Sequence, residues 1–293
     1  MKYRIRHETS FDYELPVTSS HQLLRMQPRH LQNRQHLPHH QITLSESDAE
    51  VVERNDYFGN SVHEVRLHSV HRNLAILSEC EVEIFAKDEI LVDLSPAWEG
   101  VARALKLPAN DEQWNAAQFC YSSQLVDARA AREFAQDLQE AGMPVLRLAL
   151  MLNERIYRDF TYQQGVTDIS TSVSEVLQRR TGVCQDFAHT AIATMRSLGL
   201  AARYVSGYIL GSAKQSELHL VGAQASHAWM SVYCPDFGWV DFDPTNNQVT
   251  YDQHITVGLG RDYSDVAPSR GSILGGGKQT LEVDVRVDPV YSA

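Results

Sequence analysis

Residues 181–199, TGVCQDFAHTAIATMRSLG, carry the pattern on which the fold prediction depends. Counted from Cys184, the less polar side chains recur at intervals of three and four residues, which predicts a helix over residues 183–198. Gly199 then ends the helix, and Gly182 leaves room for a substrate beside the backbone. Cys184 falls in the first turn, where the helix dipole and unpaired N–H groups favour a thiolate. It is either a small hydrophobic side chain at the end of a core or an activated nucleophile.

A base for this thiol is predicted in the strand SHAWMSVYC, residues 226–234. The nearest histidine in the sequence, His189, lies five positions from Cys184, about 140° around the helix, and faces away from it. Alternation in the strand places His227 and Trp229 on one face, opposite an apolar face that belongs against a core. His227 is therefore the candidate base, and a hydrogen-bonded structural histidine is the competing interpretation.

A carboxylate for the imidazole is predicted in the next strand, GWVDFDPT, where Asp241 and Asp243 share one face. In a hairpin of the two strands, His227 and Asp243 share a face if they are directly opposite or offset by two residues, with Cβ atoms about 5–8 Å apart. A one-residue slip would send the aspartate to the other face. Thiol, imidazole and carboxylate can then converge for nucleophilic acyl transfer, with the Cys184 N–H facing the oxyanion.

The rest of the sequence predicts an α+β protein of two domains. Residues 1–95 have the alternation and turns of a small antiparallel β-sandwich. Helical spacing follows in DARAAREFAQDLQE, in PVLRLALMLNERIY and around residues 174–179. Strands at 201–210, 226–234 and 238–245 form an antiparallel sheet on which the cysteine helix is expected to pack. The second predicted domain, 96–293, is a catalytic core with C-terminal extension strands such as LEVDVRV.

Composition and charge limit the classes of function. The formal net charge of −11, without a domain-scale basic block, argues against nucleic acid or a membrane surface as a partner. The first residues, MKYRIRHETS, lack the apolar stretch of a signal peptide, so we expect a cytoplasmic protein whose four scattered cysteines are free thiols. The histidine-rich stretch HLQNRQHLPHH has no cysteine or carboxylate at ligand spacing, so we expect a solvated loop and no metal. Its histidines are His30, His36, His39 and His40.

The stretches GVCQDFAH, RYVSGY, SHAWMSVY and WVDFDPTN resemble the bacterial transglutaminase-like family, within the papain-like cysteine enzymes. Residues 1–95 resemble the β-rich N-terminal domain of that family, and HITVGLGRDYSDVAP is similar to the stretch that follows its core. The resemblance implies a catalytic triad of Cys184, His227 and Asp243, and it decides for Asp243 over Asp241. Many relatives have a glutamate at the position of Ser231, a departure that leaves the three roles intact.

Three further residues are candidates for contact with a substrate. Tyr162 and Gln185 are candidates for a side chain that donates a hydrogen bond to the oxyanion. Trp229 either lines a substrate groove or packs between sheet and helix.

The implied function is thiol-dependent acyl transfer on a protein or peptide amide, without a cofactor. Hydrolysis, as in a cysteine protease or amidase, is favoured because small free-standing relatives are often assigned as cysteine proteases. Transfer of a protein glutamine to an amine, the transglutaminase reaction, uses the same residues and stays an alternative, since the two reactions differ in how water enters the site. The third alternative is a non-catalytic scaffold that binds peptides, and a complete triad argues against it.

Overall fold

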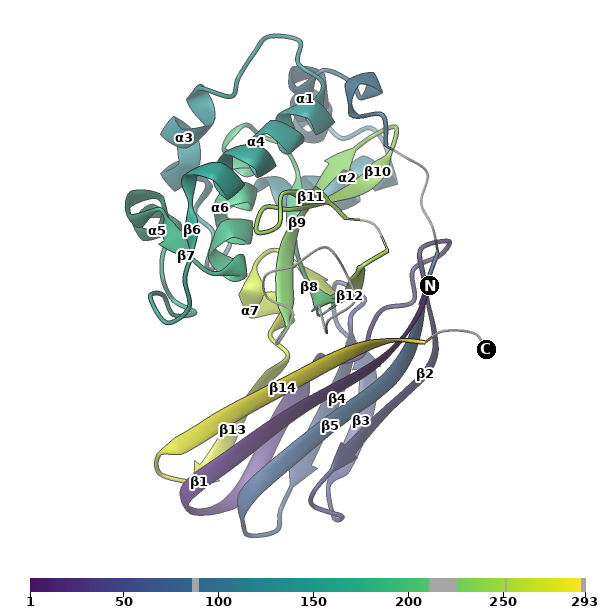
Figure 1. Cartoon of the computed structure of the whole chain (residues 1–293), viewed down its shortest axis with the longest axis vertical. Helices are drawn as coiled ribbons and strands as arrows, with labels where there is room; N and C mark the ends of the chain where they lie inside the picture. Colours follow the sequence, from purple (N-terminus) through teal and green to yellow (C-terminus); the bar gives the residue numbers. More distant parts are fainter. Residues whose placement is uncertain (86–89, 211–225, 251, 291–293) are drawn as a thin grey trace.

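The computed structural model describes residues 1–85, 90–210, 226–250 and 252–290. An antiparallel β-rich unit forms the lower part of Figure 1, and a mixed α/β unit forms the upper part. This arrangement confirms the predicted fold class, an N-terminal β domain followed by an α+β core. None of the helices in the described residues is long and apolar enough to cross a lipid bilayer.

The strands of the β-rich unit are β1 (Lys2–Leu24), β2 (Gln35–Leu44), β3 (Glu50–Asn55), β4 (Ser61–Leu67), β5 (His71–Ile84), β13 (Ser269–Gly275) and β14 (Gln279–Val290). They form one antiparallel sheet with β1 at its centre. Residues 2–13 of β1 pair with β14 and most of them also with β5, whereas residues 17–24 pair with β13 and, in part, with β4. The ladder with β5 is irregular between Asp12 and Val17, where β1 exchanges one set of neighbours for the other.

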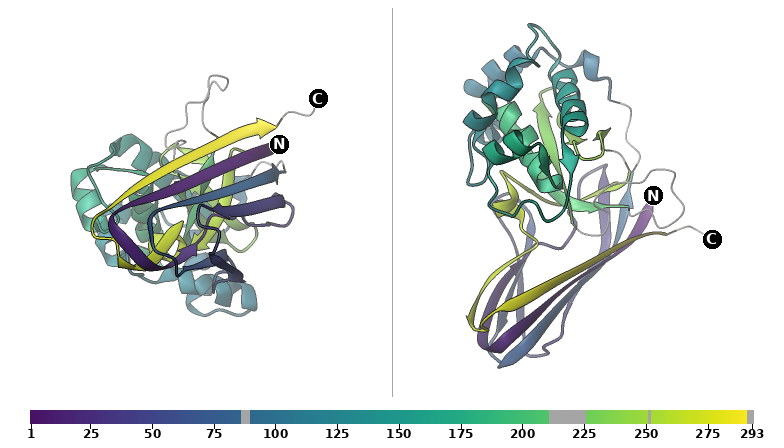
Figure 2. Two further views of the ribbon diagram at one scale, coloured as in Figure 1. Left: turned by 90° about the horizontal axis from the view of Figure 1, so that it is seen from below. Right: turned by 60° about the vertical axis from the view of Figure 1, so that its left-hand side comes forward.

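The core of this unit lies between the two halves of β1. Side chains along β1 alternate between buried and more exposed, as expected for a strand with one face on a core. Phe11 and Tyr13 from the first half pack in one cluster with Val17 and Leu24 from the second half and with Leu74 of β5. A single curved sheet, seen from two further directions in Figure 2, therefore encloses the core of the predicted sandwich.

The last two strands belong to this first sheet. β14 pairs with β1 from Lys2↔Val290 to Tyr13↔Gln279, and β13 continues the pairing to Leu24↔Ser269. The predicted second domain, 96–293, includes these strands as extensions of the core. The β-rich unit instead combines residues 2–84 with residues 269–290. The long edge of β1 is completed by strands that are far away in the sequence, which alternation alone does not reveal.

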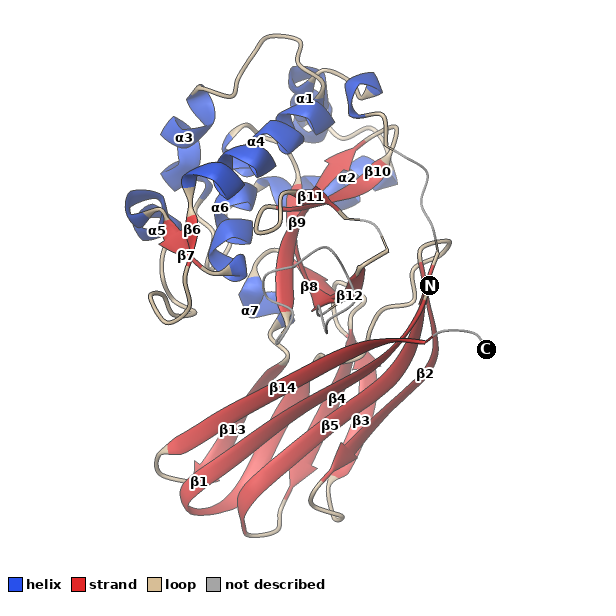
Figure 3. Ribbon diagram, in the orientation of Figure 1, coloured by secondary structure: helices blue, strands red, loops and turns tan. Residues whose placement is uncertain are grey.

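The α/β unit contains a second antiparallel sheet with the order β11-β10-β9-β8-β12. Its strands are β8 (Ala202–Ile209), β9 (His227–Cys234), β10 (Gly238–Asp243), β11 (Gln248–Val249) and β12 (His254–Gly260), and a small parallel pair is formed by β6 (Thr161–Tyr162) and β7 (Thr181–Gly182). The helices are α1 (Trp98–Lys106), α2 (Asp111–Ala117), α3 (Arg132–Gln136), α4 (Val145–Asp159), α5 (Val173–Arg179), α6 (Cys184–Ser197) and α7 (Tyr263–Val266). Figure 3 shows that these helices all lie in the upper unit.

Helix α6 is the centre of the α/β unit. Its residues from Asp186 to Arg196 are all buried, because α6 packs on β8 and β9 and is covered by α3, α4 and α5. The apolar face of β9 lies against it, as predicted, through Ala228, Met230 and Val232. The cysteine at the start of α6 is thereby held at a fixed place relative to the sheet.

The β-rich unit covers the free edge of the second sheet. β12 is an edge strand, and its backbone is bonded by two amide side chains that imitate a neighbouring strand. Gln35 accepts the N–H of Thr256 and donates to its carbonyl, both at 2.8 Å. Asn60 makes the same pair of bonds with Leu259, again at 2.8 Å. Both amides are buried, so β12 is fixed by contacts from the first unit.

Candidate active site

Cys184 is the first residue of α6, and the side chain of Asp186 caps the N-terminus of that helix. The carboxylate of Asp186 folds back and accepts the backbone N–H of Val183 at 2.8 Å and the hydroxyl of Thr167 at 2.7 Å. A Cβ at Gly182 would lie 2.5 Å from that carboxylate. Gly182 therefore makes room for Asp186, whereas the sequence suggested room for a substrate. The Cys184 side chain itself remains partly exposed.

His227 and Asp243 meet at the end of the β9–β10 hairpin. The register pairs Trp239 with Tyr233 and Asp241 with Ser231, so Asp243 is offset by two residues from His227 on the same face. This is one of the two registers that the sequence allowed. Nε2 of His227 donates to Oδ2 of Asp243 at 2.8 Å, and both side chains are completely buried.

Five N–H groups converge on the carboxylate of Asp243. Oδ1 accepts the backbone N–H groups of Thr245 and Asn246 at 2.9 and 3.3 Å, which closes the turn after β10. Oδ2 accepts Nδ2 of Asn246 at 2.7 Å and Nε2 of His254 at 3.0 Å, in addition to His227. A carboxylate with donors on both oxygens has one orientation and stays ionised.

The charges of this pair follow from burial and from their mutual attraction. Burial alone would lower the pKa of His227, but Asp243 and the nearby Cys184 outweigh it and raise the pKa to about 10. Burial alone would raise the pKa of Asp243, but His227 and His254 hold it far below its usual range. Nδ1 of His227 makes no hydrogen bond of standard geometry with the described residues, which leaves it available to the Cys184 thiol. An imidazolium beside this sulfur stabilises a thiolate.

Asp241, the competing carboxylate, serves a different partner. Its Oδ2 accepts an N–H of Arg34, which reaches it from the β-rich unit, at 2.7 Å. Arg203 lies in the same region, stacked 4.0 Å above the ring of Trp239, and Asp241 raises the pKa of this guanidinium, although burial dominates and lowers it to about 9. The structure thus brings Asp243, and not Asp241, to His227.

Two predicted substrate contacts, Tyr162 and Gln185, lie near the thiol. Tyr162 in β6 is opposite Gly182 in β7, two residues before Cys184. Burial raises the pKa of Tyr162, and the proximity of Cys184 raises it further. Gln185 is partly exposed in the first turn of α6.

Trp229 lies elsewhere. Its side chain has no exposed surface, and it packs with Val205 and Leu259 on the face of the sheet away from α6. It touches the His254 ring edge-on, with ring centroids 5.1 Å apart. Trp229 therefore packs against the rings of His227 and His254 as a buried residue, and its side chain is not exposed to a groove.

Sequence reasoning assigned no role to His254 and Asn246, which both bond Asp243. The signal for Asn246 was the turn sequence DPTN, because an aspartate commonly accepts backbone N–H groups two or three residues later. The signal for His254 was weaker. It opens an alternating stretch, HITVGLG, and only the position of β12 across β8 from β9 shows that its ring reaches Asp243.

The two histidines and Asp243 have the composition of a metal site. Nε2 of each ring and one carboxylate oxygen lie within 4.8 Å of one another. Ligands about 2.0–2.1 Å from a tetrahedral zinc ion would be about 3.3 Å apart, but Oδ2 lies 2.8 and 3.0 Å from the two nitrogens. These distances fit hydrogen bonds from the two rings to the carboxylate. The described residues therefore form a hydrogen-bond network here.

Comparisons with known proteins identify the family of the chain. Residues 132–244 match the transglutaminase-like superfamily, and residues 3–83 match the bacterial transglutaminase-like N-terminal region. An uncharacterized protein of Mycobacterium tuberculosis is 38% identical over 299 residues, which cover 99% of this chain and 92% of that protein. A protein-glutamine gamma-glutamyltransferase of Pseudomonas aeruginosa is 29% identical over 125 residues, or 39% of this chain and 18% of that protein.

A solved structure shares the whole architecture. The crystal structure of a "putative cysteine protease" from Cytophaga hutchinsonii superposes with a TM-score of 0.76 at 18% identity. The match covers 100% of this chain and 92% of the other, so the order of the β-rich unit and the core is the same in both. The chain belongs to the transglutaminase-like superfamily, and it carries the bacterial transglutaminase-like N-terminal region ahead of its core.

Proposed function

We propose that the protein is a cysteine enzyme that transfers the acyl group of a protein or peptide amide, with Cys184 as the nucleophile. The observation that carries the proposal is the convergence of three groups from separate elements. Cys184 begins α6 and is close enough to His227 to help raise the pKa of its ring, and His227 is bonded to Asp243 at 2.8 Å. This is the arrangement that nucleophilic acyl transfer needs.

Each group has a defined part in the reaction. The Cys184 thiolate attacks the amide carbon and forms a C–S bond, while N–H groups of the first turn of α6 face the negative oxygen. The His227 imidazolium donates its proton to the leaving amine as the C–N bond breaks, which yields a thioester and a neutral imidazole. Asp243 holds the ring in place and favours its charged form. The imidazole then removes a proton from water as the water oxygen attacks the thioester carbon and the C–S bond breaks, which releases an acid and restores the thiolate and the imidazolium.

Hydrolysis is the proposed outcome, and a protein or peptide in the cytoplasm is the proposed substrate. If an amine replaces water in the second step, the same residues carry out transglutamination. That second candidate is favoured by the similarity of 125 residues to a protein-glutamine gamma-glutamyltransferase. A peptide-binding scaffold without catalysis is opposed by the hydrogen-bonded His227–Asp243 pair beside the cysteine.

The first test is the reactivity of the thiol. Burial raises the pKa values of Cys80 and Cys120 to about 12, so these two cysteines are internal controls. With limiting iodoacetamide at pH 7, Cys184 is expected to be alkylated first and by a wide margin, as peptide mass spectrometry would show. Equal rates at the three cysteines would contradict an activated nucleophile.

The second test identifies the reaction. Active protein and the Cys184→Ala variant are incubated separately with the same bacterial cell extract, and the extracts are compared by mass spectrometry. Cleaved peptides or deamidated glutamines that appear only with active protein would indicate hydrolysis. Lysine–glutamine cross-links would indicate amine transfer instead. Identical extracts would argue for a binding protein without catalysis.

A further inference from the structure

His254 is a second histidine on the carboxylate of Asp243. Its Nε2 donates to Oδ2 at 3.0 Å, the same oxygen that accepts His227 at 2.8 Å. The side chain is only 2% exposed. Its other ring nitrogen, Nδ1, has no hydrogen-bond partner in the described part of the chain. The bond to Asp243 is thus the only polar contact of the ring that the described residues provide.

We propose that His254 is a positioning residue for the acyl-transfer site, an inference that rests on the proposed function. Its N–H shares Oδ2 with His227 and thereby sets both the direction of the carboxylate and the plane in which His227 is held. His254 does not touch Cys184 or a substrate, and it acts through Asp243. The result is an ordered row of sulfur, imidazole, carboxylate and second imidazole.

The neighbours of His254 leave its ring little freedom. Trp229 packs against it edge-on, with ring centroids 5.1 Å apart and ring planes at 81°. The centroid of the His227 ring is 6.2 Å from that of His254. The backbone is fixed as well, because His254 begins β12, whose outer edge is bonded to Gln35 and Asn60. The β-rich unit therefore acts on the active site through the placement of this strand.

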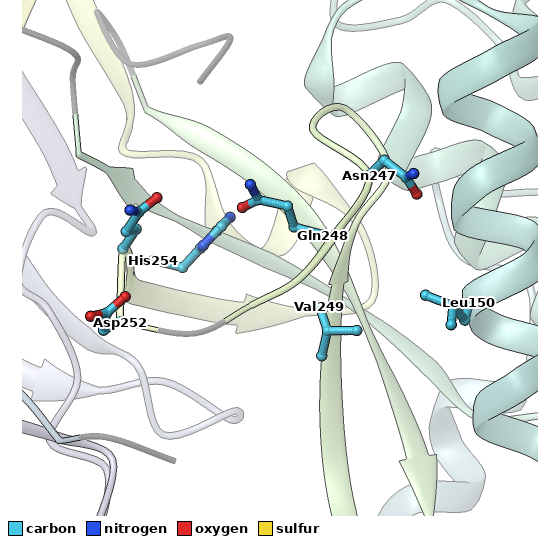
Figure 4. A pocket seen from close by; sticks show the side chains of 7 residues that line it. Leu150, Asn247, Gln248, Val249, Asp252 and His254 are labelled. Atoms are coloured by element: carbon cyan, nitrogen blue, oxygen red, sulfur yellow. The ribbon is translucent and has the colours of Figure 1, made fainter. Parts of the chain in front are cut away.

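A cavity beside His254 makes the idea directly testable. Leu150 of α4, residues 247–249 and residues 252–254 surround a space of about 410 Å³ (Figure 4). Removal of the imidazole from residue 254 would add its volume to this space. Free imidazole can enter such an enlarged cavity and offer the missing N–H to Asp243.

The first comparison uses two variants of similar shape. His254→Gln keeps an N–H near the position of Nε2, and His254→Met has similar length without a donor. The readout is the rate of Cys184 alkylation by iodoacetamide, which needs no known substrate. We expect the Gln variant to stay within about threefold of wild type and the Met variant to fall about tenfold or more, since a hydrogen bond to a charged group is lost. Circular dichroism confirms that each variant is folded.

The second comparison restores the contact from solution. Alkylation of Cys184 in His254→Gly should be slow and should recover with added imidazole at pH 8, where imidazole is mostly neutral. It should not recover with 1-methylimidazole, which fills the same space without an N–H. Equal rescue by both compounds would show that His254 only fills volume, and this would overturn the inference.

The outcomes separate the two proposals. Fast alkylation of Cys184 in both wild type and His254→Met would overturn the positioning role and leave the proposed function standing. Slow alkylation of Cys184 in wild-type protein, no faster than that of Cys80, would overturn the proposed function and the positioning role together. Fast wild type, slow His254→Met and rescue by imidazole alone would support both.

Discussion

Asp243→Asn removes the charge that keeps His227 protonated and preserves the size of the side chain. Burial opposes the charged imidazole, and Asp243 is the largest influence that favours it. A pKa of about 10 against an ordinary 6.5 is a difference of about 3.5 units, or on the order of 5 kcal/mol for the imidazolium. Asp243 stabilises the imidazolium in the resting protein as well as in the transition state, so only part of this energy lowers the reaction barrier. We therefore expect turnover to fall about 10³-fold.

The amide also disturbs the hydrogen bonds of the site. Oδ1 accepts backbone N–H groups of Thr245 and Asn246, and Oδ2 accepts side-chain N–H groups that include those of His227 and His254. An asparagine has one NH₂ group, which faces other donors whichever way the amide is turned. The variant should therefore also lose stability, so measurements belong at a temperature where circular dichroism shows it folded.

Two measurements test the reasoning without a known substrate. Titration of the His227 ring by NMR should show its pKa falling well below about 10, because Cys184 is then the main group that still opposes the effect of burial. Alkylation of Cys184 at pH 7 should slow at least about tenfold. The control is Asp241→Asn, on the same strand face but bonded to Arg34, and it should change the alkylation rate by less than about threefold. An unchanged His227 titration in Asp243→Asn, or an equal loss in Asp241→Asn, would refute the assignment.

Three further predictions follow from the surroundings of the site. Gly182→Ala places a Cβ 2.5 Å from the Asp186 carboxylate, so it should lower the free energy of unfolding by about 1–3 kcal/mol in urea titrations; unchanged stability would show that Asp186 moves freely. Arg34→Ala removes this partner from Asp241, which is only 4% exposed. Because Arg34 itself is 29% exposed, we expect the free energy of unfolding to fall by about 2 kcal/mol. A change near zero would mean that solvent replaces the ion pair. The pKa of His227 is raised from 6.5 to about 10 on folding, so its stabilisation is fully present below pH 6.5 and is lost as the pH rises through about 10. The difference in unfolding free energy between wild type and His227→Gln should shrink over that range, and a difference that grows with pH would contradict the sign.

Local patterns predicted much of the structure around the site. The helix over residues 183–198 is observed as Cys184–Ser197, because its apolar spacing and the glycine after it act within one element. The strands that carry His227 and Asp243 were also predictable. The requirement that both side chains lie on the same face of the hairpin restricted the register to two choices. Their short hairpin makes these residues neighbours in space as well as in sequence.

Contacts between distant segments were beyond such patterns. β13 and β14 add to β1 from the other end of the chain, and no local signal distinguishes them from strands of the core. The burial of Trp229 depends on β12 lying across β8, and the approach of His254 to Asp243 depends on the same placement. Arg34 reaches Asp241 only because the two units are joined along that edge.

The pairing of β1 with β14 also has a consequence for biosynthesis. β1 leaves the ribosome before β14, which is translated about 15–60 s later at ordinary rates of synthesis. During that interval β1 has an unpaired edge, the kind of surface on which nascent chains aggregate or recruit chaperones. A shortened protein that stops before residue 269 would keep this bare edge permanently. Recombinant versions of the α/β unit should therefore retain both β1 and the pair β13 and β14, or omit all three.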